Sequence, residues 1–360
     1  MAKLLNTTFL VTQSAPATPS SGFGTLYASG SSLYYKNSNG INYNLTLAGS
    51  GSVSVFTGGG TWTKSPNIKY IKVVCVGAGG GGGSGRRTTA GAATCGGGGG
   101  GGGSISVAYF DSSSLLSTSY TINVGSGGPG GPGRTVAFDG AAGVAGTNSS
   151  FVSSSTSLVV AVGGTPGNGG RTNVGQGITP GGGTSLVNGG INNAPTTATV
   201  PNPNPPFYIV GQNGSQSGQN TPTNASNCFN SNRTLAGGGG GGGITAAGVS
   251  GSGGSGSAIY NYNNLIQSGS PGTVNGIING DNGAPVFDVS QLLYYSGSVL
   301  ATGVQVGTGG HGGAGGATSG AGGSGGLGAG GGGGGGNLTT GIAGAGGPGG
   351  NGFVLIFEYY

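Results

Sequence analysis

The amino-acid sequence predicts an elongated, mostly β protein in which short β-strands alternate with glycine-rich polyproline-II helices packed side by side, with essentially no α-helix. Glycine supplies 95 of the 360 residues, and long tracts hold much of it. Within 309–336, glycine recurs at one position of a three-residue register, and three residues per turn is the period of the polyproline-II helix. Hydrophobic segments with a period of two, such as 71–76, separate the tracts and indicate β-strands.

The conformational entropy that glycine loses when it is ordered must be compensated by other interactions. Each glycine costs roughly 0.5–1 kcal/mol relative to alanine in a regular element, so the sum is on the order of tens of kcal/mol, above a typical net stability of about 5–15 kcal/mol. A folded chain therefore requires dense hydrogen bonding between backbones that approach closely on side-chain-free faces. The alternatives are a flexible Gly/Ser linker and a collagen-like helix. Collagen is disfavoured because 309–336 contains no proline.

The 309–336 tract is too long to run straight through a compact domain. At about 3.1 Å per residue it would span about 87 Å. We therefore expect the chain to fold back near Thr318–Ser319 and again near Leu327. His311, the single histidine of the chain, lies in this tract, and we expect a solvated or tract-lining side chain.

The sequence of residues 1–50 predicts an extended arm followed by a small β module. The β-prone runs 33–36 and 41–45 flank 37–40, where Asn39-Gly40 supplies the positive φ angles of a tight hairpin. The pattern APATPSSGFGTLYASGSSLYYKNSNGINYNLT, residues 15–46, resembles the N-terminal module of bacteriophage tail-fibre and collar proteins. The resemblance implies contact with other virion proteins through this region and a homotrimer.

Residues 51–360 predict a glycine-rich domain with variable spacer loops. The strand at 71–76 runs directly into a glycine tract, and another tract runs into the C-terminal strand at 353–360. These two hydrophobic strands bracket the glycine-rich region. We expect them to pair and to place residues 74 and 355 side by side.

The segment 53–360 is similar to the glycine-rich domain of phage tail fibres and adhesins. Its interior combines short strands with glycine tracts at 118–131, 146–151 and 157–170. In receptor-binding adhesins of T-even-like phages, packed polyproline-II helices carry variable loops that bind the host. The resemblance implies a virion protein, made in the host cytoplasm.

The composition excludes several classes of protein. Ten Lys and Arg against five Asp and Glu give a net charge of +5, without the basic stripe and interleaved aromatics of a nucleic-acid-binding protein. Cys75, Cys95 and Cys228 are far apart and predict free thiols rather than disulfides or a zinc site. No segment approaches the roughly 20 apolar residues of a membrane span, so we expect no membrane insertion. Residues 1–17 do not match a signal peptide.

Catalytic chemistry lacks the necessary residues. The five carboxylates are not spaced as a local acid–base pair, and one histidine in a glycine tract cannot be held in a triad by packed neighbours. No glycine is followed by lysine, which excludes the Walker phosphate loop. We therefore expect no enzyme activity, no cofactor and no metal.

Binding is the better hypothesis, because aromatic and arginine side chains in the breaks between tracts are favoured recognition anchors. The spacers 191–235 and 257–306 are the least repetitive parts. Candidate receptor-binding residues are Arg86, Arg87, Phe207, Tyr208, Phe229, Arg233, Tyr260, Tyr262, Tyr294 and Tyr295. The alternative for each aromatic is a local core that pins its spacer to the domain.

The sequence and its resemblances together predict a bacteriophage fibre or spike protein that contacts a host surface polysaccharide or an outer-membrane protein. Two alternatives remain open at this stage. One is a purely structural collar, capsid or connector fibre without receptor specificity. The other is a glycine-rich protein of a bacterial surface or matrix.

Overall fold

The computed structural model describes residues 51–89, 92–171, 237–256, 279–282, 309–338 and 341–360, short stretches of 14–44, and five isolated strands between 207 and 307. These residues form β-strands and extended segments without any α-helix. The prediction of a mostly β protein is therefore confirmed for the described part of the chain.

The N-terminal module is a three-stranded antiparallel meander. Its strands are β1 (Thr25–Ser29), β2 (Ser32–Lys36) and β3 (Asn42–Asn44), in that order in the sheet. Lys36 lies opposite Asn42, and Gly40 takes a φ of 77° in the connecting turn, which confirms the predicted hairpin. The Lys36 Nζ donates a hydrogen bond to the carbonyl oxygen of Pro16 at 2.7 Å, which ties the preceding arm to the module.

A five-stranded antiparallel sheet is the first layer of the main body. Its strands, in spatial order, are β12 (Phe207–Ile209), β8 (Ile105–Asp111), β6 (Tyr70–Val76), β18 (Phe353–Tyr359) and β4 (Gly51–Phe56). Val74 of β6 lies directly opposite Leu355 of β18. The predicted pairing of the two bracketing strands is confirmed, and it joins the two ends of the glycine-rich region.

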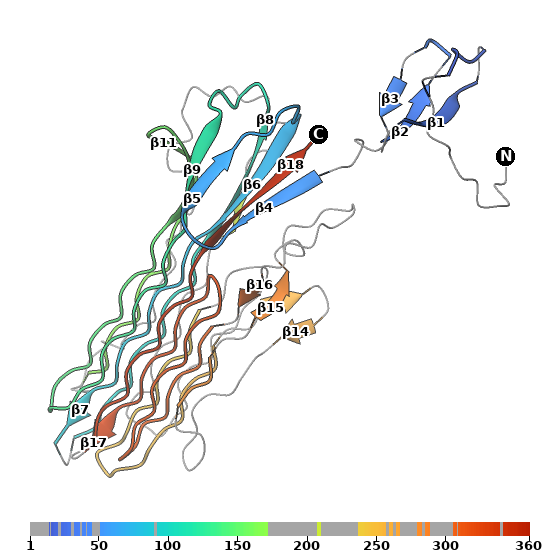
Figure 1. The fold of residues 1–360 in the computed structure, drawn as a ribbon. Helices are drawn as coiled ribbons and strands as arrows, with labels where there is room; N and C mark the ends of the chain where they lie inside the picture. The colour runs from blue at the N-terminus through green and yellow to red at the C-terminus, as the bar shows by residue number, and fades with distance from the viewer. Residues whose placement is uncertain are drawn as a thin grey trace.

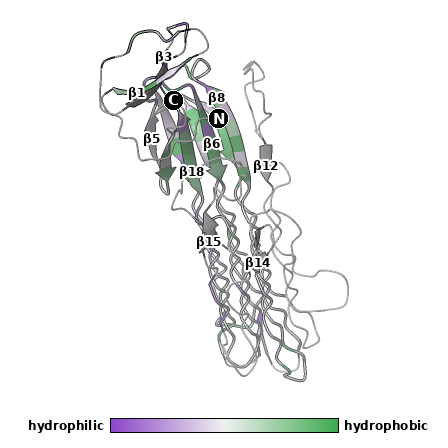
Figure 2. Cartoon of the chain, turned by 90° about the vertical axis from the view of Figure 1, so that its right-hand side faces the viewer, coloured by the Kyte–Doolittle hydropathy of each residue, from purple (hydrophilic) through white to green (hydrophobic). Residues whose placement is uncertain are grey.

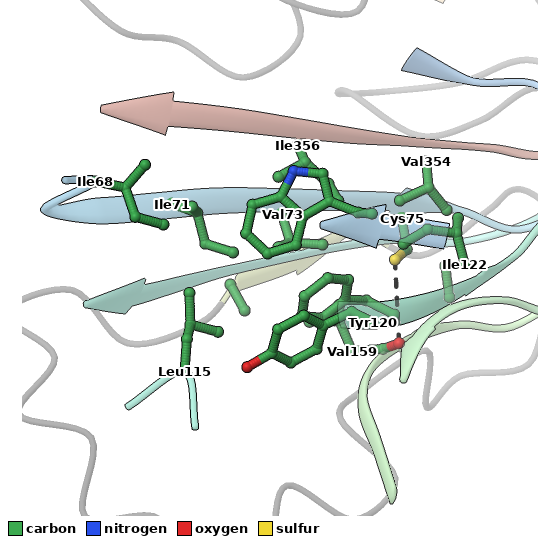
Figure 3. Close-up of a cluster of buried hydrophobic side chains, with 14 residues drawn as sticks. Ile68, Ile71, Val73, Cys75, Leu115, Tyr120, Ile122, Val159, Val354 and Ile356 are labelled. Carbon is green, nitrogen blue, oxygen red and sulfur yellow. Dashed lines mark hydrogen bonds between the residues drawn. The ribbon is translucent and has the colours of Figure 1, made fainter. Parts of the chain in front are cut away.

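A four-stranded sheet packs against one face of the first. Its strands, in spatial order, are β11 (Thr156–Ala161), β10 (Ser149–Ser153), β9 (Ser119–Asn123) and β5 (Gly60–Thr63). Figure 3 shows the core between the sheets, where Ile71, Val73 and Cys75 point toward Tyr120 and Val159. The Tyr120 ring stacks on Phe151 with centroids 4.7 Å apart.

The opposite face of the five-stranded sheet is also buried. Val74, Val76 and Leu355 pack in a second cluster that includes Ala329, at the start of a glycine-rich helix. Both faces of β6 and β18 are therefore covered, which explains why these strands are continuously hydrophobic rather than alternating. Figure 2 shows this apolar sequence concentrated in the strands rather than in the glycine-rich segments.

The strands continue into a bundle of parallel and antiparallel extended segments (Figure 1). The amides of Gly77, Gly80 and Gly83 donate to successive carbonyls of the neighbouring segment at 2.8–2.9 Å. The partner thus repeats every third residue, and the hydrogen bonds run between segments rather than within one. Those two properties identify polyproline-II helices, as predicted.

The described helices form four layers of three, as their hydrogen bonds define. The first two layers continue the sheets; they are 162–171, 140–148 and 124–133, then 95–104, 77–86 and 343–352. The third layer is 237–244, 329–336 and 319–326, and the fourth is 251–256, 309–315 and 279–282. The chain bends at 316–318 and turns at Leu327–Gly328, so both predicted reversals of the 309–336 tract are confirmed.

The 77–86 helix is enclosed on all sides. Its amides donate in rotation to three neighbours, 95–104, 140–148 and 343–352, and its carbonyls accept from three others, 124–133, 162–171 and 329–336. The 329–336 helix is enclosed in the same way by six neighbours. Interior backbone groups thus find partners without any side chain, which satisfies the demand that buried amides and carbonyls be hydrogen-bonded.

A helix with more neighbouring helices contains more glycine. In the enclosed 329–336 helix, a Cβ atom at Gly330, Gly331 or Gly332 would lie 2.0–2.1 Å from a carbonyl oxygen of a different neighbouring helix. The outer helix 140–148 has glycine only at every third position. The three-residue register predicts one side-chain-free face per helix. An enclosed helix needs three such faces, because neighbouring backbones block all three positions of each turn.

Two-residue strands and short hairpins complete the described structure. β7 (Arg87–Thr88) and β17 (Asn337–Leu338) pair in parallel at the end of the bundle remote from the sheets. β13 (Ile259–Asn261) pairs with β14 (Asn264–Ile266), and β15 (Pro285–Asp288) pairs with β16 (Gln305–Gly307).

Candidate functional site

The two ends of the main body differ in what they present. Gly51, where the described main body begins, lies opposite Tyr359 at the outer edge of the five-stranded sheet. The opposite end of the bundle consists of the turns that join the helices, near β7 and β17 (Figure 1). We call this opposite end the tip; its described residues are 87–89, 92–94, 134–139, 245–249, 316–319, 338 and 341–342.

Four arginines gather at the tip on neighbouring helix ends; they are Arg86, Arg87, Arg134 and Arg171. The Arg86 guanidinium forms an ion pair with the Asp139 carboxylate. The Arg134 Nε donates to the Asp139 carbonyl oxygen at 2.9 Å. Asp139 therefore positions two of the four guanidinium groups.

Arg87 and Arg171 adjoin this pair through the backbone. The Arg87 amide donates to the Phe138 carbonyl oxygen at 3.1 Å, and the Arg171 carbonyl accepts from the Cys95 amide at 3.1 Å. The Cys95 carbonyl in turn accepts from the Arg86 amide. The Arg171 side chain is exposed, whereas Arg86, Arg87 and Arg134 are half-buried.

Lysines occupy the opposite end of the main body. Lys64 and Lys69 flank strands of the sandwich, and Lys72 lies within β6. Among the residues that the structure describes, every arginine is at the tip and no lysine is. The tip thus concentrates the planar, bidentate type of cation.

Exposed apolar side chains lie beside the arginines. Val136 and Phe138, in the 134–139 turn, are each 64 % exposed, and Ile342 is 60 % exposed. A Cβ atom at Gly133 would lie 3.3 Å from the Ile342 side chain, which places Ile342 against the start of the same turn. The tip therefore combines cationic and apolar surface in one small area.

Buried polar side chains hold the tip turns in place. The Asn337 Nδ2 donates to the carbonyl oxygens of Gly316 and Ala317 at 3.0 and 2.9 Å. The Ser319 Oγ donates to the Gly336 carbonyl oxygen at 2.7 Å. These bonds fix the 316–319 turn to the enclosed 329–336 helix.

Comparison with known protein families identifies the main body. The model of a family described as a glycine-rich domain matches residues 54–360. The chain belongs to this glycine-rich domain family. No curated protein matches the chain. The family description names the composition of the domain and assigns no activity to it.

The glycine-rich domain brings together only part of the predicted binding set. Arg86 and Arg87 lie at the tip, as described above. Phe207 and Tyr208 lie on β12 and Tyr260 on β13, where the structure describes the backbone alone. The other candidates lie outside the described residues; they are Phe229, Arg233, Tyr262, Tyr294 and Tyr295.

Sequence reasoning missed the remaining tip residues. Arg134, Val136 and Phe138 lie in the six-residue break 134–139, to which the sequence analysis assigns no role, and Arg171 and Ile342 each adjoin a tract. The available signal was the position of each break. Successive tracts of the described chain run in opposite directions, so every second break between tracts lies at the same end of the bundle.

Potentially reactive side chains of the glycine-rich domain are buried singly. His311 is 1 % exposed, and its Nδ1 accepts a hydrogen bond from the Gly256 amide at 3.3 Å. The side chain is therefore not solvated but lines the tract, because the helices 251–256, 279–282 and 319–326 surround His311 and bond to its imidazole, amide and carbonyl. Cys75 and Cys95 are buried and form no disulfide bond. No three His, Cys, Asp or Glu side chains gather as potential metal ligands in the described residues.

Two buried charges lie in the sandwich rather than at the tip. The Glu358 carboxylate accepts hydrogen bonds from Ser52, Trp62, Ser65 and Tyr360 at 2.5–3.1 Å. Burial alone would raise the pKa of this carboxyl, but the four donors together lower the pKa below its ordinary value. Glu358 thus joins the end of β18 to β4 and to the segment 62–65, which is a structural role.

Lys72 is the second buried charge. Its Nζ lies 5.4 Å from the Phe357 ring centroid and 5.9 Å from that of Tyr109. Burial lowers the pKa of Lys72 to about 8.

Among the described residues, no helix is long and apolar enough to cross a membrane.

Proposed function

We propose that the chain is a bacteriophage virion fibre or spike protein whose tip turns bind the host cell surface. The observation that carries the proposal is that the two ends of the main body differ. The chain joins it at the outer edge of the sandwich, beside the C-terminal strand, while the tip at the opposite end presents turns with exposed side chains.

The construction of the bundle supports a binding role for its turns. A Cβ atom at most glycines of the enclosed helices would overlap the backbone of a neighbouring helix, and the Ala78, Ser84 and Ala329 side chains there are fully buried. These helices therefore present no recognition side chains along their length. Exposed side chains can be placed in the turns at the ends of the helices and on the outward faces of the outer helices, where Val144 is 54 % exposed. A rigid platform that presents variable loops is the usual arrangement in recognition proteins.

The N-terminal module supports attachment at the other end. Its residues 15–46 carry the resemblance to phage tail-fibre and collar modules, and small β modules gain stability by pairing with other chains. We propose that this module joins the protein to other virion proteins and to two further copies of itself. The mature protein then resides in the virion.

The proposed partner at the tip is a host surface polysaccharide or an outer-membrane protein. Phe138 and Ile342 provide exposed apolar contact area, and arginine provides directional hydrogen bonds. The domain needs no catalytic group for this role.

Competition for adsorption tests the proposal. Purified full-length protein, added in excess to cells that the parent phage infects, is expected to slow adsorption of the phage. The double variant Phe138→Ala, Ile342→Ala is expected to compete more weakly. Leu116→Ala is the matched control, because Leu116 is 92 % exposed in a turn at the sandwich end.

Two results would count against the proposal. If the protein is present in purified particles but neither it nor its tip variants alter adsorption, the chain is a structural component without receptor specificity. If the protein is absent from particles and is found on bacterial cells, it is not a virion protein.

A further inference from the structure

We propose that the arginine cluster of the tip (Arg86, Arg87, Arg134 and Arg171) binds a polysaccharide that bears phosphate or carboxylate groups. The inference rests on the proposed function, since it names the chemical class of partner for the same end of the molecule. It selects an anionic glycan from the two kinds of partner considered above.

The described tip carries a net positive charge. The described tip holds four arginines against one aspartate, Asp139, which leaves three positive charges in one small area. The whole sequence contains only ten Lys and Arg. In a chain with so few charges, a basic patch does not arise by chance. The concentration of positive charge at one end therefore points to an anionic partner.

The cations of the described tip are all arginine. The guanidinium is planar and offers a fork of N–H donors that matches phosphate and carboxylate oxygens in pairs, whereas lysine offers a point charge. The described lysines of the main body all lie at the sandwich end. Segregation of arginine from lysine therefore favours recognition of discrete oxyanions over a general attraction to negative charge.

Asp139 fixes the geometry of part of the cluster. The Asp139 carboxylate pairs with Arg86, and the Asp139 carbonyl accepts from Arg134 at 2.9 Å. Two guanidinium groups are thereby oriented before a ligand arrives, which reduces the entropy lost on binding. Arg171, the exposed member, adjoins them through the 95–104 helix.

The apolar neighbours favour a glycan over a membrane. Val136, Phe138 and Ile342 form a small exposed area that can cover the apolar face of a sugar ring. Docking on a lipid surface relies instead on a long amphipathic face with a large apolar area. Three side chains on turns held by backbone hydrogen bonds do not supply that area.

Binding of full-length protein to immobilised polysaccharides tests the inference. The probes are phosphomannan for phosphate, polygalacturonate for carboxylate and dextran as the neutral control, each measured at increasing sodium chloride concentration. We expect binding to one or both anionic polymers, with affinity that falls as salt rises, and no binding to dextran. The two anionic arms distinguish the source of the oxyanion.

Charge-matched variants locate the binding surface. Arg171→Gln removes one exposed positive charge at the tip, and Lys69→Gln removes one exposed positive charge at the sandwich end. We expect Arg171→Gln to weaken binding about tenfold, the size of a lost charge-assisted hydrogen bond, and Lys69→Gln to leave it unchanged. Arg134→Gln is a second tip variant with the same expectation.

Several results would overturn the inference. Equal binding to dextran, equal losses in Arg171→Gln and Lys69→Gln, or binding to phosphatidylglycerol vesicles in place of both anionic polymers would each do so. These results are distinguishable from a failure of the proposed function. A protein that still blocks phage adsorption through Phe138 and Ile342, but ignores anionic glycans, retains that function and takes a different partner.

Discussion

The carbonyl oxygen of Gly332 lies 2.1 Å from the position that a Cβ atom would occupy on Gly82. The two glycines belong to the two enclosed helices, and no shift of a flexible side chain can relieve the overlap because the obstructing atom is backbone. The separation between enclosed helices is therefore set by the absence of side chains on both.

Substitution of Gly82 by alanine tests that constraint. We expect Gly82→Ala to lower the free energy of unfolding by about 3 kcal/mol, at the upper end of the range for overpacking, because helices with six neighbours cannot move apart locally. Denaturant unfolding measures the change. Gly58→Ala is the control, since a Cβ atom there would meet nothing within 4 Å. Equal stability of the two variants would show that the bundle is loosely packed.

Glu358 makes stability depend on pH on the acid side. Its pKa is lowered in the folded protein, so its contribution is fully present above the ordinary pKa of 4.5 and is lost as pH falls through the lower folded value. We expect Glu358→Gln to reduce the free energy of unfolding by about 2 kcal/mol at pH 7, because charged hydrogen bonds are lost. Ser65→Ala, which removes one donor, should cost less.

Thermal unfolding of wild type and Glu358→Gln at several pH values below 5 measures this contribution. The difference in stability between the two proteins should shrink as pH falls. A difference that stays constant with pH would mean that Glu358 acts through packing alone.

Whereas charged Glu358 stabilises the folded protein, charged Lys72 destabilises it. Burial lowers its pKa from 10.5 to about 8, so the folded state carries an unfavourable charge below pH 8, and stability rises with pH between about 8 and 10.5. We expect Lys72→Met to be about 1 kcal/mol more stable at pH 7, since the ring contacts offset only part of the burial. Chemical denaturation at pH 7 and pH 10 measures the change.

The control for Lys72 is its exposed neighbour. Lys69→Met should change stability by less than about 0.5 kcal/mol at both pH values. The advantage of Lys72→Met over wild type should decrease at pH 10. Destabilisation by Lys72→Met at pH 7 would mean that the contacts with Phe357 and Tyr109 outweigh the burial of the charge.

Local patterns were sufficient to predict the elements of the fold. The three-residue register and the long hydrophobic strands at 71–76 and 353–360 specified polyproline-II helices and the strands that bracket them. The pairing of Val74 with Leu355 also followed, because two fully hydrophobic strands both require a central place in a sheet that is covered on both faces. The reversal at Leu327 followed from length alone.

The arrangement of the helices could not be predicted from those patterns. Gly83 pairs with Gly334 and Gly98, yet glycine tracts carry no side chains that distinguish one partner from another. The order of the first two layers comes from the strands to which the helices are joined. The proximity of Arg134, Phe138 and Ile342 depends on that order, which is why sequence reasoning found Arg86 and Arg87 but missed their neighbours.

Amide hydrogen exchange of the assembled protein tests the central claim most directly, namely that side-chain-free helices hold one another through their backbones. The amides of 331–336 each donate to a neighbouring helix at 2.8–3.0 Å, and those of 79–85 do so at 2.8–2.9 Å. The account predicts strong protection of both segments, comparable to that of β6 and β18. Exchange of 331–336 at the rate of an unstructured peptide, while the sandwich remains protected, would contradict it.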